Sequence, residues 1–377
     1  MLSLPPLSLY IHLPWCEKKC PYCDFNSHQA PEKIPENDYI DALTADLASQ
    51  LDFVQSRPLH SIFFGGGTPS LFSTQTIGSI LERIEKHTPF SHNIEITLEA
   101  NPSSANTQDM RALRTTGVNR LSIGVQSFNN DHLRTLGRVH DKQQALQTVH
   151  AAQNAGFSRI NLDIMHGLPA QTVNNAIDDL QQAMGMEVEH ISWYQLTLEP
   201  NTVFYQQRPT LPDEITLAAI EDQGLSLLKE HGYQRYEISA YTRNQGCDHN
   251  LNYWQFGDYL GIGAGAHSKI TLPAQQQIRR HYNLKQPQSY LAQPHTAIAN
   301  HHVIPKASRL TECLMNGLRL AQGISRGYVM QRTGLSDEDI TRYTQPLIKR
   351  GLLTDGDAIT CTPLGWQHLD TVLAQFP

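Results

Sequence analysis

Three cysteines, Cys16, Cys20 and Cys23, fall within eight residues of a 377-residue chain that holds six cysteines in all. Thiolates bind soft metals and iron–sulfur clusters, and three of them on one short loop can cover one face of a single centre. A 4Fe–4S cluster normally takes four cysteines, so three would leave one iron with an open coordination position. The alternative is a zinc site completed by His12 or His28, although structural zinc usually takes its ligands as two separated pairs. The spacing therefore favours an iron–sulfur cluster.

Further polar and glycine-rich candidates follow at the ends of predicted strands. The segment GGGTP (65–69) could bring backbone N–H and C=O groups close to a ligand, because glycine has no Cβ, but it is equally consistent with a tight turn. Glu99, Gln126 and Asp163 end or interrupt the next three apolar runs and could point into a barrel, where the alternative is a layer of mutual hydrogen bonds. Arg138 lies between a strand and a helix, where a lone arginine is more often a surface charge.

The elements that would position these residues alternate between strand and helix. Six short apolar runs rich in β-formers are each followed by a segment of helical period, and they span 7–13, 60–66, 93–100, 120–127, 159–168 and 190–198. Strands that alternate with helices require right-handed crossovers and a parallel sheet. Six units fall short of the eight that close a TIM barrel. We therefore predict an α/β fold, a partial TIM-like (β/α)6 barrel, over residues 1–205.

The pattern changes after residue 205. Residues 206–300 are predicted to form a barrel extension and linker: a helix over 214–231, a strand at 233–241, an irregular stretch that contains CDHNLNYW and GIGAGAHS, and a loop or linker from about 270 to 300. Residues 301–377 give short helices and then a hairpin, which predicts a smaller winged-helix-like α+β domain. Its basic and acidic residues nearly balance, so packing or a lid role is favoured over DNA binding.

Composition limits the class of protein. The formal net charge is −7, which gives no reason to expect extended contact with nucleic acid. No run approaches eighteen apolar residues, and the N-terminus has no positive segment ahead of an apolar core, so we expect neither a membrane anchor nor a secretory signal. The bunched cysteines are unlike a disulfide framework and suit a reducing compartment. A cytoplasmic protein is predicted.

The pattern C-x3-C-x2-C after the first strand, with GGGTP after the second, resembles the radical S-adenosylmethionine (SAM) superfamily. Within it the chain resembles the oxygen-independent coproporphyrinogen III oxidase branch and its heme chaperones, because eight motifs occur in the order that branch shows: LYIHLPWCEKKCPYCDF, FFGGGTPS, LEANP, LSIGVQSF, LGRVH, NLDIMHGLP, LTLEPNTVF and HNLNYW. The resemblance implies a 4Fe–4S cluster on Cys16, Cys20 and Cys23, with SAM at the open iron. It further implies roles in the SAM pocket for three sets of residues. Tyr10 and Tyr22 would lie beside the cluster, and Gly66, Gly67 and Thr68 would hold the methionyl part. Four other residues would contact SAM: Glu99, Gln126, Arg138 and Asp163.

Phe25 stands where the oxidases of this branch carry a fourth cysteine. That departure argues against oxidase activity and agrees with the heme chaperones, which also carry an H-N-x-x-Y-W motif, here His249, Asn250, Tyr253 and Trp254. Histidine can ligate heme iron, and aromatic rings can lie against the macrocycle. The residues alone favour a loop histidine held by hydrogen bonds, whereas the resemblance makes His249 the leading heme ligand. Two residues are weaker alternatives, Cys247 and His267.

The resemblance thus implies a heme chaperone of the radical SAM fold that binds heme, a 4Fe–4S cluster and SAM and hands heme to an acceptor protein. A reducing electron donor is the second implied partner. Two alternatives stay open. One is the oxygen-independent coproporphyrinogen III oxidase itself, in which a radical abstracts hydrogen from propionate side chains. The other is a zinc-stabilised binding module that uses the C-terminal domain.

Overall fold

A run of parallel strands forms the centre of a curved, twelve-stranded sheet in the computed structural model, which describes residues 1–104 and 107–376. In spatial order the parallel strands of the described chain are β11 (Asp258–Ile262), β1 (Leu7–Leu13), β4 (Leu59–Gly66), β5 (Phe90–Ala100), β6 (Arg120–Gln126), β7 (Arg159–His166) and β8 (His190–Gln195). The six strands predicted for the barrel are β1, β4, β5, β6, β7 and β8. Their carboxyl ends therefore meet at one edge, where barrels of this kind place their sites.

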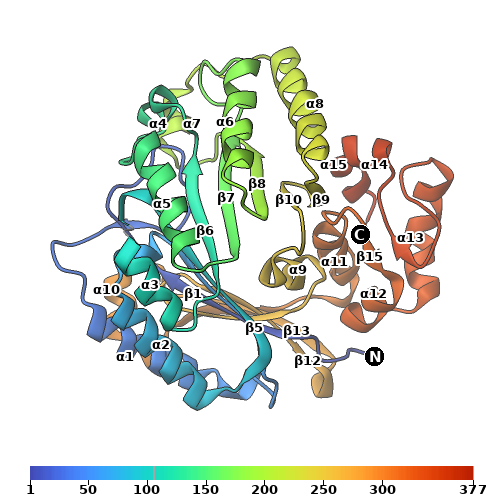
Figure 1. Ribbon diagram of the computed structural model, residues 1–377. Helices are drawn as coiled ribbons and strands as arrows, with labels where there is room; N and C mark the ends of the chain where they lie inside the picture. Colours follow the sequence, from blue (N-terminus) through green and yellow to red (C-terminus); the bar gives the residue numbers. More distant parts are fainter. Residues whose placement is uncertain (105–106, 377) are drawn as a thin grey trace.

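Helices follow the strands and cover the outer face of the curved sheet (Figure 1). The main ones are α1 (Glu36–Ser49), α2 (Thr74–His87), α3 (Thr107–Thr115), α5 (Lys142–Asn154), α6 (Val173–Gly185) and α8 (Glu214–Glu230). Side-chain caps fix several helix starts, because Ser73, Asp141, Thr172 and Asp213 each accept a hydrogen bond from a first-turn backbone N–H. The predicted α/β fold with a partial barrel is confirmed.

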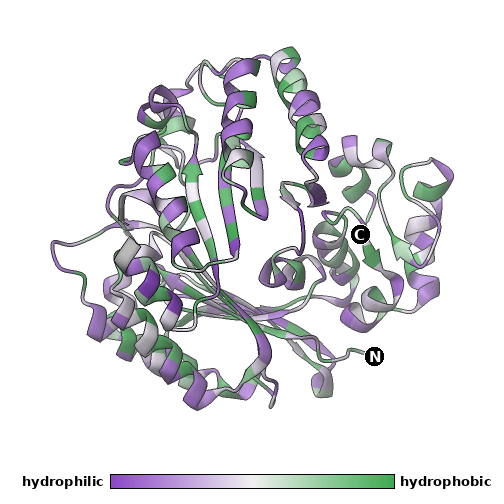
Figure 2. Cartoon of the chain, in the orientation of Figure 1, coloured by the Kyte–Doolittle hydropathy of each residue, from purple (hydrophilic) through white to green (hydrophobic). Residues whose placement is uncertain are grey.

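The two faces of β1 show how the barrel separates core from site. Leu7, Leu9 and Ile11 are fully buried among the residues of the main hydrophobic core. Alternate positions point the other way because side chains alternate along a strand, and Tyr10 and His12 line the barrel interior. Figure 2 shows the same division, with hydrophobic residues concentrated along the strands and hydrophilic residues on the outer sides of the helices.

The segment from about 270 to 300, predicted as a loop or linker, is instead ordered secondary structure. It contains the second half of β12 (His267–Leu272), all of β13 (Gln277–Asn283) and α10 (Pro287–Ala292), and the start of β14 (Ile298–Val303). These strands extend the sheet antiparallel beyond β11. These strands can be rich in polar residues because backbone hydrogen bonds between them stabilise the sheet and one face of an antiparallel sheet can face solvent. The predicted strand 233–241 is likewise a hairpin of β9 (Gln234–Glu237) and β10 (Ala240–Thr242) at the opposite edge.

A smaller C-terminal domain packs beside the barrel on a core of its own. Its helices are α11 (Arg309–Gly317), α12 (Arg326–Thr333), α13 (Asp337–Lys349), α14 (Pro363–Gln367) and α15 (Leu369–Leu373), and β15 (Ile324–Ser325) pairs with β16 (Ala358–Ile359). An antiparallel bridge between Leu353 and Cys361 closes the predicted hairpin. The N-terminus returns to this domain, where the Ser3 backbone N–H donates to the Gln331 carbonyl at 2.9 Å (Figure 1).

Candidate metal centre and cofactor cavity

The cysteine loop begins where β1 ends. Cys16 lies in the short strand β2 (Trp15–Cys16), which pairs with β3 (His28–Gln29), and a turn between them carries Cys20 and Cys23. The turn is closed by the Cys23 backbone N–H, which donates to the Cys20 carbonyl at 3.2 Å. All three thiols are free and line one cavity of about 320 Å³. Burial raises the pKa of Cys16 and Cys23 above the ordinary thiol value, so a bound metal would have to displace their protons.

The arrangement of these thiols bears on the kind of centre they could hold. In the described part of the chain, no group of three or more His, Cys, Asp or Glu side chains is arranged as ligands of a single metal ion. Three thiols that line one cavity suit a multi-iron cluster, because each iron can take its own thiolate. Phe25, at the position of the absent fourth cysteine, also lines the cavity and is 62% exposed. The donor set therefore fits an iron–sulfur cluster better than zinc.

The glycine turn after β4 lies directly against the cysteine loop. The backbone N–H of Gly67 donates to the Leu13 carbonyl, and that of Thr68 to the Trp15 carbonyl, both at 2.8 Å. A Cβ on Gly67 would lie 2.5 Å from the Trp15 oxygen, so only glycine permits this approach. Gly66 has a φ of +113° and a Cβ there would meet the His12 ring. The turn is therefore a fixed wall of the cavity.

Two partly buried carboxyl groups, Glu99 and Asp163, line the same cavity, close enough for the charge of one to act on the other. Glu99 at the end of β5 accepts a 3.3 Å hydrogen bond from the Gly66 backbone N–H, and burial together with the charge of Asp163 raises the Glu99 pKa to about 8. Asp163 accepts from the Ser122 hydroxyl at 3.1 Å and the Asn161 amide at 2.8 Å, and burial raises its pKa as well. A pair of acids in this state would be stabilised by a cationic ligand.

Gln126 and Arg138 complete the cavity on the side of β6. The pairing of β6 with β7 shifts register just before Gln126, whose φ of +69° is unusual for a residue other than glycine and turns it toward the cavity. Its Oε1 accepts a hydrogen bond from the Tyr194 hydroxyl at 2.7 Å. Arg138 reaches inward, where Nη2 donates to the Gly124 carbonyl at 2.8 Å and Nη1 lies 3.7 Å from the Cys20 sulfur. It is thus part of the cavity and not a solvated surface charge.

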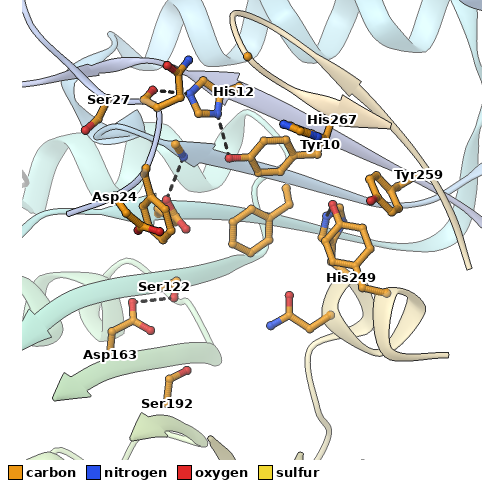
Figure 3. A pocket seen from close by; sticks show the side chains of 18 of the residues that line it. Tyr10, His12, Asp24, Ser27, Ser122, Asp163, Ser192, His249, Tyr259 and His267 are labelled. Atoms are coloured by element: carbon orange, nitrogen blue, oxygen red, sulfur yellow. Dashed lines mark hydrogen bonds between the residues drawn. The ribbon is translucent and has the colours of Figure 1, made fainter. Parts of the chain in front are cut away.

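The structure brings together most of the residues that the sequence singled out. Eleven of them line the 320 Å³ cavity: Cys16, Cys20, Cys23, Tyr22, Gly66, Gly67, Thr68, Glu99, Gln126, Arg138 and Asp163. Tyr10 and His249 lie instead in a larger cavity of about 820 Å³ (Figure 3). The two cavities share six lining residues, Phe25, Ser27, Gly66, Glu99, Ser122 and Asp163. They are adjacent compartments of one barrel interior.

The H-N-x-x-Y-W motif is helical, which corrects the prediction of an irregular stretch. It forms α9 (Asp248–Trp254), whose first N–H groups are satisfied by a side chain from β5: the Glu95 carboxylate accepts from the backbone N–H of Asp248 and of His249, each at 3.0 Å. The thiol of Cys247 also donates to Glu95, at 3.3 Å, and is fully buried. No sequence motif indicates this role of Glu95, because its hydrogen bond to His249 joins residues more than 150 positions apart.

Both ring nitrogens of His249 are in use. Nδ1 shares a 2.9 Å hydrogen bond with the Ser61 hydroxyl, and Nε2 shares one of 2.9 Å with the Tyr253 hydroxyl. Burial lowers the pKa of His249 to about 3, so the ring is neutral and both bonds are satisfied by one tautomer. Iron ligation through Nε2 would require the bond to Tyr253 to break.

Comparisons with known proteins agree with this geometry. The family model of the radical SAM superfamily matches residues 10–183, and that of the HemN C-terminal domain matches residues 304–368. The chain is 46% identical to the heme chaperone HemW of Haemophilus influenzae, with 100% of this chain and 99% of the relative covered. It is 42% identical to HemW of Escherichia coli, with 100% and 99% covered. It is 34% identical to the mitochondrial radical S-adenosyl methionine domain-containing protein 1 of Bos taurus, with 97% and 86% covered.

Among solved structures, that of coproporphyrinogen III oxidase (HemN) from Escherichia coli has a TM-score of 0.83 at 22% identity and covers 99% of this chain and 90% of that one. The likeness shows a shared fold.

The curved parallel sheet, the three-cysteine loop at its carboxyl edge and the glycine turn beside it define a radical SAM protein, a class that implies a 4Fe–4S cluster and SAM. Within that class, the full-length similarity assigns the chain to the HemW heme chaperone family. Within the described residues, no helix is long and apolar enough to cross a membrane.

Proposed function

We propose that this protein binds a 4Fe–4S cluster and SAM in the smaller cavity and heme in the larger one, and that it delivers the heme to an acceptor protein. The observation that carries the proposal is the shared wall: a three-thiol cavity adjoins a second cavity of about 820 Å³, within the size range of cofactor sites. The relatives' names support the heme role, and the radical SAM class supports the cluster.

Cys16, Cys20 and Cys23 are the proposed cluster ligands. The three thiols line one cavity, so they would hold three irons of a cluster and leave the fourth without a protein thiolate, open to another ligand. Arg138 lies beside Cys20, with Nη1 3.7 Å from the sulfur, where a guanidinium would offset part of the negative charge of a thiolate-bound cluster. When bound, the cluster would supply one-electron reducing power next to SAM, which requires the electron donor that we propose as a partner.

The SAM site is proposed along the glycine turn and the two partly buried acids. Gly66, Gly67 and Thr68 line the cavity, and burial, which raises the pKa of both Glu99 and Asp163, outweighs the hydrogen bonds that the protein gives these two carboxyl groups. The ammonium group and ribose hydroxyls of SAM would add hydrogen-bond donors to those that Gly66, Ser122 and Asn161 already supply, and the ammonium charge would favour the ionised carboxylates. Gln126 and Tyr22 line the same cavity as further contacts.

The larger cavity has features that suit a flat, iron-bearing macrocycle. Five phenylalanine and tyrosine side chains line it, Tyr10, Phe25, Phe63, Tyr253 and Tyr259, and Tyr10 and Phe63 stack with centroids 6.3 Å apart. Lys19 and Lys285 lie in its wall, where their ammonium groups could pair with propionate carboxylates. His249, the heme ligand that the family resemblance implies, and His267, the weaker alternative, both line this cavity. Cytoplasmic location and a heme acceptor complete the proposal.

The test is anaerobic reconstitution followed by metal analysis and a hemin titration. We expect about four irons and four sulfides per chain, with a large loss in Cys16→Ser. Cys361→Ala is the matched control, because Cys361 lies in the C-terminal core away from both cavities. Hemin should bind saturably and pass to an apo-acceptor such as an apocytochrome.

Three results would overturn the proposal. Zinc without iron and sulfide would exclude the cluster. Absence of saturable hemin binding would exclude the chaperone role. Turnover of coproporphyrinogen with SAM and a reductant would favour the oxidase.

A further inference from the structure

Four histidines line the larger cavity, and they differ in whether their ring nitrogens are available. His12 shares hydrogen bonds with the Tyr10 hydroxyl at 3.1 Å and the Asn26 carbonyl at 2.8 Å. His249 is engaged at both nitrogens by Ser61 and Tyr253. Each of these two rings would have to give up a buried hydrogen bond in order to bind a metal, which costs free energy.

The other two histidines are freer. His28 shares a 3.3 Å contact between Nε2 and the Asn26 side chain. None of the residues that the structure describes forms a hydrogen bond with the ring of His267, which is exposed to the cavity at the start of β12. A neutral imidazole needs one unshared nitrogen lone pair to ligate iron. His267 is therefore the histidine of this cavity that could ligate iron without breaking a hydrogen bond to the protein.

The ring of His267 is nonetheless held in place. It stacks on Tyr282 with ring centroids 5.3 Å apart and an interplanar angle of 28°, and the two residues are directly paired across β12 and β13. A ligand on a rigid strand keeps its orientation better than one on a loop. Figure 3 shows His267 on the opposite side of the drawn cavity from Asp163 and Ser192.

The surroundings of His267 suit the rest of the macrocycle. Tyr10, Tyr253 and Tyr259 line the same cavity and offer flat rings against which a porphyrin could lie. Lys285 also lines it, is exposed, and lies close enough to His267 for its charge to act on the ring. An ammonium group at this rim is placed to receive a propionate carboxylate.

We propose that His267, and not His249, supplies the axial ligand to the iron of heme bound in the larger cavity. The inference rests on the proposed function. In it, His249 orders α9 and the cavity wall through Ser61 and Tyr253 and does not touch the iron.

The experiment is an anaerobic hemin titration of the cluster-reconstituted full chain, followed by the Soret band and by electron paramagnetic resonance of the ferric iron. The variants are His267→Gly, His249→Ala and the control His92→Ala, which changes an exposed histidine outside the cavity. Iron and sulfide content and far-ultraviolet circular dichroism check that each variant is folded. We expect His267→Gly to lose the histidine-ligated spectrum and to bind hemin at least about tenfold more weakly.

Added imidazole decides the outcome, because it can replace a missing ligand ring but not a missing structural hydrogen bond. Restoration of the parent spectrum by imidazole in His267→Gly supports the inference. An unchanged spectrum in His267→Gly, or a lost spectrum that imidazole does not restore, overturns it and leaves the proposed function standing. If the parent protein itself binds no hemin, the proposed function fails and the inference with it.

Discussion

The side-chain amide of Asn26 donates a hydrogen bond to the carbonyl oxygen of Ala264 at 3.0 Å, which joins the cysteine loop to the glycine loop before β12. The same amide donates to the Lys285 carbonyl at 2.9 Å. A Cβ on Gly265 would lie 2.4 Å from the Asn26 amide nitrogen, so glycine is required for this approach. The side chain of Asn26 thus connects the proposed cluster loop, through hydrogen bonds, to the cavity wall that carries His267.

Asn26→Ala should loosen that link. The change removes both bonds to carbonyl groups, so we expect the free energy of unfolding to fall by about 1–3 kcal/mol and the cluster to be lost faster to an iron chelator. Chemical denaturation and the rate of bleaching of the cluster absorbance measure the two effects. Asn174→Ala, at an exposed position of α6, is the control. Equal bleaching rates for the two variants would show that the link does not hold the loop.

Gly67→Ala should weaken SAM binding while keeping all three cysteines in the sequence. The new Cβ would lie 2.5 Å from the Trp15 carbonyl oxygen, so the glycine turn must move away from the end of β1. We expect at least a tenfold weaker affinity for SAM, about 1.4 kcal/mol, by isothermal titration of the reconstituted protein. Gly78→Ala is the matched control, because its Cβ would meet only ordinary contacts with Thr116 on the outer layer. Parental affinity in Gly67→Ala would place SAM elsewhere.

Glu99 should make the stability of the apoprotein depend on pH. Its pKa is about 8 in the folded protein, raised by burial and by Asp163, against an ordinary value of 4.5. Between these values the unfolded chain has lost the proton that the folded protein still holds, so stability falls as the pH rises through this window.

Glu99→Gln should remove that part of the dependence. We expect the parent protein to lose at least about 1 kcal/mol more than the variant between pH 5.5 and 8.5 in urea denaturation. Glu85→Gln, at an exposed position of α2, should keep the parental slope. The same slope in the parent and in Glu99→Gln would contradict a raised pKa.

Glu95→Gln should destabilise the helix that carries the H-N-x-x-Y-W motif. The buried carboxylate pairs with Arg159 at 2.9 Å and accepts from two N–H groups at the start of α9. Breaking a buried pair leaves an uncompensated charge, so we expect a loss of about 3 kcal/mol at pH 7 by chemical denaturation.

The pH dependence of Glu95 should be opposite in sign to that of Glu99. Burial alone would raise the pKa of Glu95, but the charges of Arg120 and Arg159 outweigh it and lower the pKa. Its stabilisation is therefore complete above the ordinary value of 4.5 and is lost as the pH falls through the lowered pKa. A gap between parent and variant that grows toward low pH would contradict this assignment.

Residue types alone predicted those parts of the site that lie within a short stretch of the chain. Three cysteines in one loop and a glycine turn after a strand are short-range patterns, and the alternation of strands with helices places both at the same sheet edge. The segment from 270 to 300 was mispredicted because its strands are polar and depend on pairing with β11 and with each other, which no local periodicity records.

The sequence by itself determined the parallel barrel and the cysteine loop, since apolar period and ligand spacing are written along the chain. Only the tertiary structure decided how the histidines are used. The sequence ranks His249 above His267 as a heme ligand, but both ring nitrogens of His249 are hydrogen-bonded, to Ser61 and Tyr253, whereas His267 is open to the cavity. The bond between Ser61 and His249 joins residues 188 positions apart, and it exists only once the sheet has curved and brought β4 against α9.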